Sequence, residues 1–227
     1  MKKIITILSV IFISLSVHAN DIYINQSGAT LDLDITQDGN NNTVGNSTTA
    51  SSVIGATTNL AITQIGDSNV MTFDVNGATY TGTFSVTGNS NNIDFNCDSA
   101  GNNSSCGTAT ASIVWVGSSN DIDIDIGETS SATSATVGIT GASGSDSNTI
   151  LGTIDGNSAI LTLSVNGDTN NFLIDIDGNG DSAGHTYIHT HTGSIADVDI
   201  TQSGIYDNMI TLTTSGDNHD IDIIQRD

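Results

Sequence analysis

One short phrase recurs along the chain: an alternating apolar stretch, a Gly, a tight gap, and an Asn that opens a second stretch. The fullest copies are Leu33-x-Ile35-x-Gln37-x-Gly39 with Asn42, Leu60-x-Ile62-x-Gln64-x-Gly66 with Asn69, and Val198-x-Ile200-x-Gln202-x-Gly204 with Asn208. A repeated unit of this size cannot bury its apolar face alone, so it must stack on its neighbours. The sequence therefore predicts stacked units rather than an ordinary globular core.

Both halves of each unit have the pattern of a β-strand with one buried face. Strict alternation, as in the run from Ile122 to Ile126, is typical of such strands, and no segment after the N-terminal leader has a helical period. One Gly marks each predicted turn, in the order Gly39, Gly66, Gly88, Gly117, Gly141, Gly167 and Gly204. We expect an all-β fold, a β-solenoid of about seven strand-turn-strand coils with two facing parallel sheets.

An antiparallel β-sandwich of short strands is the alternative architecture. Gln37, Gln64 and Gln202 favour the solenoid, because each occupies an inward position two residues before the Gly. A single buried amide is costly, whereas amides stacked coil on coil can bond to one another in ladders. On this interpretation the three glutamines are equivalent.

The first 19 residues are typical of a secretory signal peptide. Lys2 and Lys3 precede an apolar run, and Val17-His18-Ala19 resembles a cleavage site. The run is too short to cross a bilayer, and no other stretch is long enough. We expect residues 1–19 to be the leader, residues 20–227 to be one repeat domain, and the protein to be secreted.

The charge of the chain is strongly negative, at −22 formal charges. Without the leader, Arg226 is the only Lys or Arg residue. Nucleic acid is excluded as a partner, because phosphate binding requires basic side chains. Many enzymes also use Lys or Arg to stabilise developing anions, so we expect a protein that is not an enzyme. An extracellular polysaccharide lyase is disfavoured for the same reason.

Five features are candidates for chemistry beyond the repeat. In an oxidising compartment Cys97 and Cys106 are expected to form a disulfide, with free thiols or a metal pair as alternatives. Asp175, Asp177 and Asn179 match the first half of a calcium loop, although Thr186 stands where the bidentate Glu is expected, and an ordinary turn is favoured. Outward Asp residues, as at Asp121, Asp123 and Asp125, could attract screening cations.

The remaining two features are weaker. His185, Tyr187, His189 and His191 would share one side of a strand, but they fall in what the repeat spacing predicts as an insert, so a solvated polar edge is favoured over a metal site. Pairs of the form Thr-x-Thr suggest binding to ice, a hypothesis that we disfavour because the pairs do not fall in one register of the predicted coils. These pairs are Thr81/Thr83, Thr190/Thr192 and Thr211/Thr213.

The segments 34–42, 61–69 and 199–204 resemble the curlin repeat, in which Gln, Gly and Asn follow at set positions. Curlin proteins are secreted bacterial subunits of curli, the functional amyloid fibres of biofilms. The resemblance implies stacked coils, self-association, a second curlin-like subunit and a dedicated secretion pore. It further implies ladder roles for Gln37, Gln64, Gln202, Asn42, Asn69 and Asn208, and turn roles for Gly39, Gly66 and Gly204.

Departures from the repeat are concentrated in the middle of the chain, where other residues replace the Gln and the step lengths vary. The expected function is a secreted structural subunit of curli-like fibres that assembles by strand templating at the solenoid ends. The alternative is a monomeric extracellular adhesin or a calcium-dependent carbohydrate-binding solenoid. Formation of cross-β fibres by the purified chain distinguishes the two.

Overall fold

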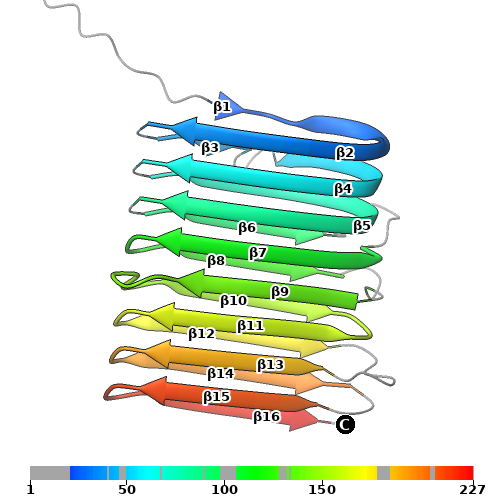
Figure 1. The fold of residues 1–227 in the computed structure, drawn as a ribbon. Helices are drawn as coiled ribbons and strands as arrows, with labels where there is room; N and C mark the ends of the chain where they lie inside the picture. The colour runs from blue at the N-terminus through cyan, green and yellow to red at the C-terminus, as the bar shows by residue number, and fades with distance from the viewer. Residues whose placement is uncertain are drawn as a thin grey trace, which may run out of the picture.

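The computed structural model describes residues 21–39, 41–45, 50–66, 68–88, 90–97, 106–127, 132, 134–177, 185–204 and 208–226. The predicted signal peptide lies outside these residues. The part of the chain that is described is all-β, without any helix, and it coils into a β-solenoid of about seven turns (Figure 1). The predicted fold class is confirmed.

Sixteen strands are described. They are β1 (Asp21–Ile22), β2 (Asn25–Asp38), β3 (Thr43–Val44), β4 (Ser51–Ile65), β5 (Val70–Thr87), β6 (Asn92–Cys97), β7 (Thr108–Val116), β8 (Asp121–Ile126), β9 (Ser134–Gly141), β10 (Thr149–Asp155), β11 (Ala159–Asn166), β12 (Asn170–Asp177), β13 (Thr186–Thr192), β14 (Ala196–Ser203), β15 (Met209–Ser215) and β16 (Asp220–Arg226).

These strands form two facing parallel sheets. The first sheet runs in the order of the second halves of β2, β4 and β5, then β7, β9, β11, β13 and β15. The second sheet runs β1 with the first residues of β2, β3 with the first residues of β4, the first half of β5, and then β6, β8, β10, β12, β14 and β16. The strands β2, β4 and β5 each bend from the second sheet into the first, so the two sheets are continuous. Since every strand pair in the described part of the chain is parallel, the antiparallel sandwich is wrong.

The coils stack in register, so that side chains form columns along the solenoid. One column of the first sheet contains Ile35, Ile62, Phe84, Ile113, Ile139, Leu163, His189 and Leu212. Alternate residues of each strand point between the sheets, and the resulting core is mostly apolar, with buried Asn, Gln and His side chains near its edges and in β13. Each fully buried Ile, Leu, Val or Phe contributes about 1.5–3 kcal/mol, so the hydrophobic columns account for most of the stability.

Two of the seven expected turn glycines are misplaced. Gly141 lies inside β9, where it is buried opposite Trp115 of β7. Gly204 follows β14, at the end of the coil where the connectors lie, whereas the equivalent turns belong to Gly193 and Gly216, with φ of 145° and 142°. The prediction failed near the C-terminus because the Val198–Gly204 copy of the phrase occupies the second sheet rather than the first.

The segment His185 to Thr192 is likewise not an insert. Residues 186–192 are β13, a regular strand of the first sheet that pairs with β11 and β15. Its Tyr187, His189 and His191 are fully buried, so the expected solvated edge is wrong. A histidine-rich strand lacks the apolar alternation by which the other strands were recognised.

The search for membrane-spanning helices found none among the described residues.

Candidate functional site

An asparagine ladder runs along the edge of the solenoid at which the tight turns lie. It is formed by the residue that follows each turn, namely Asn42, Asn69, Asn91, Asn120, Asn148 and Asn170, and all six are buried. Each of the last four accepts a bond from the backbone N–H of the preceding ladder residue, as Asn120 Oδ1 does from Asn91 N at 3.1 Å. The side-chain amides also bond from coil to coil, at 2.9–3.0 Å between Asn91, Asn120, Asn148 and Asn170.

The same asparagines close their own turns. Asn42, Asn69, Asn91 and Asn120 each donate from Nδ2 to the carbonyl of the Gly three residues earlier, at 2.8–3.2 Å. The residue just before the asparagine has a positive φ in these turns, as in Ser68 and Ser90. Asn42 and Asn69 therefore occupy the ladder that the sequence predicts, and Gly39 and Gly66 occupy its turns. The longest run of bonds, however, is in the middle of the chain, where the curlin resemblance is weakest.

The predicted glutamine ladder is divided between the two sheets. Gln64 donates from Nε2 to Gln37 Oε1 at 2.7 Å in the first sheet, and the column continues with Val86 and Trp115. Gln202 lies in β14 of the second sheet, where Gln225 of β16 donates to it at 3.3 Å. Gln37, Gln64 and Gln202 are therefore not equivalent, and that prediction is wrong. The error arose because the two strands of one coil have similar sequences, so the sequence does not show to which sheet a strand belongs.

Asn208 is also displaced from its predicted position. It lies at the connector edge, just before β15, and not at the tight turns. Its Oδ1 lies 2.9 Å from His185 Nδ1, and its Nδ2 donates to the backbone carbonyl of Arg226 at 3.1 Å. It therefore ties the last strand to the connector rather than extending the asparagine ladder.

A cluster of histidines lies next to Asn170, the last residue of the asparagine ladder. His191 Nε2 lies 3.1 Å from Asn170 Nδ2 and 2.9 Å from the Gly167 carbonyl oxygen, so its ring occupies the place of a further asparagine. Its other nitrogen, Nδ1, has no partner, and its ring meets His219 edge-on at a centroid distance of 5.3 Å. His189 lies edge-on to Phe172 and 3.0 Å from the Tyr187 hydroxyl oxygen. The sequence grouped these residues but could not place them in the core.

Burial sets the ionisation of this cluster. Burial, followed by the charge of His191, lowers the pKa of His189 to about 3. Burial also lowers the pKa of His191, which His219 lowers further and the Gly167 carbonyl and Asp168 oppose. Both rings are therefore neutral at physiological pH, and protonation of either would place a charge in the core.

The two cysteines are joined by a disulfide between the end of β6 and the segment that leads to β7. Cys97 and Cys106 have their Cα atoms 5.6 Å apart, and both residues are buried. The bond closes the connector between the two sheets, and Cys97 lies in the same inward column as Val75 and Ile126.

The calcium candidate is only partly described, since Asn179 lies outside the described residues. Asp175 and Asp177 both point outward from β12. Partial burial, followed by repulsion from Asp177, raises the pKa of Asp175, and Ser203 donates to Asp177 Oδ1 at 2.8 Å. Within the described ranges no group of three His, Cys, Asp or Glu residues is placed to hold a metal ion.

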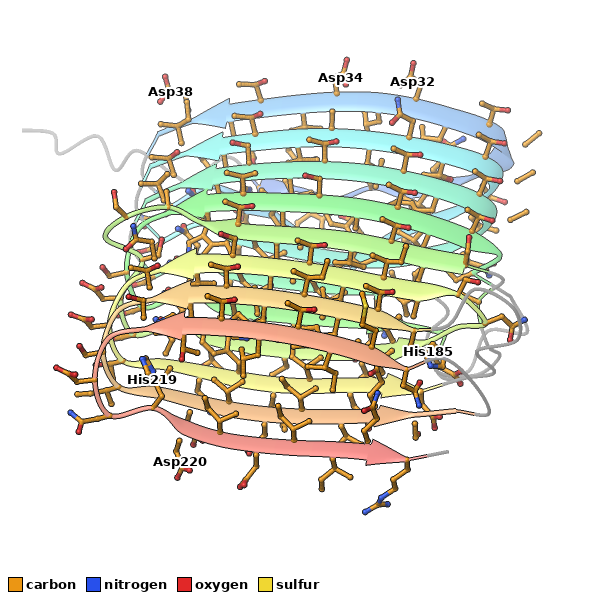
Figure 2. The ribbon with its side chains drawn as sticks, turned by 60° about the horizontal axis from the view of Figure 1, so that its bottom comes forward. Asp32, Asp34, Asp38, His185, His219 and Asp220 are labelled. Carbon is orange, nitrogen blue, oxygen red and sulfur yellow. A yellow bond between two sulfur atoms is a disulfide. The ribbon has the colours of Figure 1, made fainter. Side chains whose placement is uncertain are left out.

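The two ends of the solenoid are open. Among the strands of the described ranges, β2 pairs only with β4 and β1 only with β3 at the first end, and β15 pairs only with β13 and β16 only with β14 at the last end. The inward residues of the last coil are therefore poorly covered: Ile221 is 37% and Ile223 is 45% exposed. Figure 2 shows Asp32, Asp34 and Asp38 along the first edge and Asp220 at the opposite edge.

Both ends belong to the same columns of side chains. Gln26, near the N-terminus, continues through Val53, Val75, Cys97, Ile126, Ile154, Ile176 and Gln202 to Gln225. In the first sheet, Gln37 and Thr214 terminate one column, and Ile35 and Leu212 terminate the next. The inward residues at one end are thus chemically similar to those at the other end, whereas among the outward residues Asp21 and Asp220 share a column.

Comparisons with known proteins give no assignment for this arrangement. No protein-family model matches the chain, and neither a curated protein nor a solved structure shows significant similarity to it. The geometry of the columns and of the open ends is therefore the basis for the functional argument.

Proposed function

We propose that the protein is a structural subunit that polymerises head to tail through the two open ends of its solenoid. The observation that carries this proposal is the shared column of Gln26 and Gln225. If a second copy places its β1–β2 end on β16, Gln26 of the incoming chain lies beside Gln225. Its amide then extends the Gln225–Gln202 bond across the junction, which sets the register of the two copies.

The apolar positions support the same alignment. Ile22 and Ile24 of the incoming end would lie on Ile221 and Ile223, because these pairs occupy the same two columns of the second sheet. In the first sheet Leu33 and Ile35 would lie on Ile210 and Leu212. Unpaired backbone groups along both edges would bond in the parallel ladder already present in the solenoid.

The acidic surface would limit sideways association. With −22 formal charges and few basic residues, neighbouring subunits repel one another at neutral pH. Repulsion at the junction is partly screened by salt, so we expect assembly to accelerate with ionic strength and near the isoelectric point of about 4.1. The resemblance to curlin supports a secreted subunit of a biofilm fibre as the biological setting.

Two adjacent isoleucines in β16 provide a test with a matched control. Ile223 and Ile224 are 45% and 44% exposed, but Ile223 belongs to the inward column of Ile200 while Ile224 follows the outward Thr201. We expect Ile223→Asp to leave the free subunit folded and to abolish fibre growth, because the new charge would be buried at the junction. Ile224→Asp adds the same charge on the outside and should still form fibres.

The measurement is thioflavin fluorescence together with electron microscopy and fibre diffraction on the mature chain. Circular dichroism of each variant establishes that the subunit is folded. A wild-type chain that stays monomeric at high concentration and moderate salt would refute the proposal and favour the monomeric adhesin or carbohydrate-binding module. Equal inhibition by both substitutions would refute the head-to-tail register.

A further inference from the structure

The outer faces of the two sheets differ in charge beyond the first coil, whose strand β2 carries Asp32, Asp34 and Asp38 on the first sheet. From β4 onward, no strand segment of the first sheet contains Asp, Glu, Lys or Arg, as the sequences of β4, β7, β9, β11, β13 and β15 and the second half of β5 show. The second sheet carries most of its outward charge as Asp, for example Asp94, Asp123 and Asp199. From β4 onward, the outer face of the first sheet is therefore an uncharged surface on a strongly acidic chain.

Threonine and serine dominate this uncharged face, which we call the hydroxyl face. One outward column contains Thr36, Thr63, Ser85, Val114, Thr140, Ser164, Thr190 and Thr213. A neighbouring column contains Ala61, Thr83, Ser112, Gly138, Thr162, Ile188 and Thr211 after Asp34 of β2, and the next contains Asn59, Thr81, Thr110, Thr136, Ile160, Thr186 and Met209 after Asp32 of β2. Figure 2 shows the outward side chains of the solenoid standing in rows along successive strands.

The three Thr-x-Thr pairs that appeared unrelated in the sequence therefore share one face. Thr190 and Thr213 are direct neighbours in β13 and β15, and Thr83 lies in the same column as Thr211. The pairs are displaced from one another by one column at a time, so they overlap in a single two-dimensional lattice. The pairs do not share one register, as the sequence indicates, but they lie on one face.

The lattice is regular in two directions. Neighbouring strands are about 4.8 Å apart, and outward residues i and i+2 are about 6.7 Å apart along a strand. Threonine is branched at Cβ and has restricted χ1, so its hydroxyl and methyl groups are held in place by the backbone. Val114, Ile160 and Ile188 replace threonine at three positions and supply methyl groups there, and each is at least 36% exposed, whereas Gly138 leaves one position without a side chain.

We propose that the hydroxyl face binds the surface of ice. Its rigid hydroxyl and methyl groups can hold a layer of water in fixed positions, and their repeats are of the same order as the oxygen repeats of hexagonal ice. A charged ligand has no counter-charge on this face. Crystalline polysaccharide is disfavoured because none of the exposed large hydrophobic residues on this face is aromatic, and sugar rings commonly stack on aromatic side chains.

This inference does not depend on the proposed polymerisation. A single solenoid already carries the lattice across seven strands of the first sheet, and a fibre would only extend it. The Ile223→Asp subunit, which we expect not to polymerise, keeps the whole hydroxyl face. Ice binding by that variant therefore tests the face separately from fibre growth.

The test compares one threonine on each face. Thr162 of β11 lies on the hydroxyl face and Thr153 of β10 lies on the acidic face, and both are exposed. Tyrosine is as well accepted in strands as threonine, so Thr162→Tyr and Thr153→Tyr should both fold. Thr190→Tyr in β13 is a second variant of the hydroxyl face. Circular dichroism and thermal unfolding establish that each is folded.

We expect the wild-type chain to depress the freezing point below the melting point and to slow ice recrystallisation. Thr162→Tyr and Thr190→Tyr should each lose more than half of this hysteresis, because a bulky ring lifts the lattice away from the crystal, while Thr153→Tyr should retain it. Absence of hysteresis in the wild type would overturn the proposal. Equal loss from Thr153→Tyr, preferential binding to crystalline cellulose or chitin, or self-association through the hydroxyl face without ice activity would also overturn it.

Discussion

The indole of Trp115 in β7 occupies the space that a side chain at Gly141 in β9 would need. The two residues are register partners, and a Cβ built on Gly141 would lie 2.4 Å from Trp115 Cζ2. The same column has Val86 on one side of the pair and Val165 on the other. The large side chain of Trp115 therefore fills the space that side chains of medium size at both positions would fill, as close packing requires.

A larger side chain at Gly141 should lower the free energy of unfolding. We expect Gly141→Ala to destabilise the fold by about 1–3 kcal/mol, because the indole must move in a closely packed core. Gly138→Ala in the same strand is the control, because nothing lies within 4 Å of a Cβ at that position. Urea unfolding of both variants measures the difference, and the Trp115→Val/Gly141→Val double variant should recover part of the stability lost in the single variants. Equal stability of the two alanine variants would contradict the packing argument.

The asparagine ladder should be costly to interrupt. Asn120 accepts from the Asn91 backbone N–H at 3.1 Å and donates to the Gly117 carbonyl oxygen at 2.8 Å. Asn120→Ala leaves these buried groups without partners, at about 1–3 kcal/mol for each unsatisfied group. We expect a clear fall in the urea midpoint, measured in the Ile223→Asp background so that assembly does not interfere. Asn171→Ala, on the exposed outer surface of β12, should change the free energy of unfolding by less than about 0.5 kcal/mol.

The buried histidines predict acid sensitivity. Because the pKa of His189 is about 3 in the fold and about 6.5 in an unfolded chain, the unfolded state binds the proton first. The stability is complete above pH 6.5 and is lost progressively as the pH falls from there towards 3. Between pH 7 and 5, one such histidine lowers the free energy of unfolding by about 2 kcal/mol.

The variant His189→Leu provides the comparison, since Leu163 and Leu212 are its register neighbours. The Tyr187 hydroxyl loses its partner in this variant, so the absolute stability at pH 7 is not informative. The informative quantity is the slope of stability against pH, which we expect to be smaller than in the wild type. His191, His219 and Asp168 are present in both proteins. Identical slopes would show that His189 does not control acid unfolding.

The sequence was sufficient to predict the coils in the N-terminal half of the chain, and it failed in identifiable places. The turns at Gly39, Gly66, Gly88 and Gly117 follow the phrase, because each strand of the first sheet there ends in the same Gly-x-x-Asn pattern. The copy that ends at Gly204 belongs to the other sheet, and no local signal distinguishes the two strands of one coil. The histidine-rich β13 was missed because its buried residues are polar.

Alternation of apolar and polar residues, together with the repeated Gly and Asn, predicted stacked strand-turn-strand coils, because a strand period of two and a recurring turn leave few other ways to bury the apolar side. Only the tertiary structure shows which residues of different coils are in contact. Connector lengths vary, so equal spacing in the sequence does not mean equal position in the stack. The hydroxyl face, the matched ends at Gln26 and Gln225, and the contact of Trp115 with Gly141 all depend on register across coils, and register is determined by packing of the whole stack.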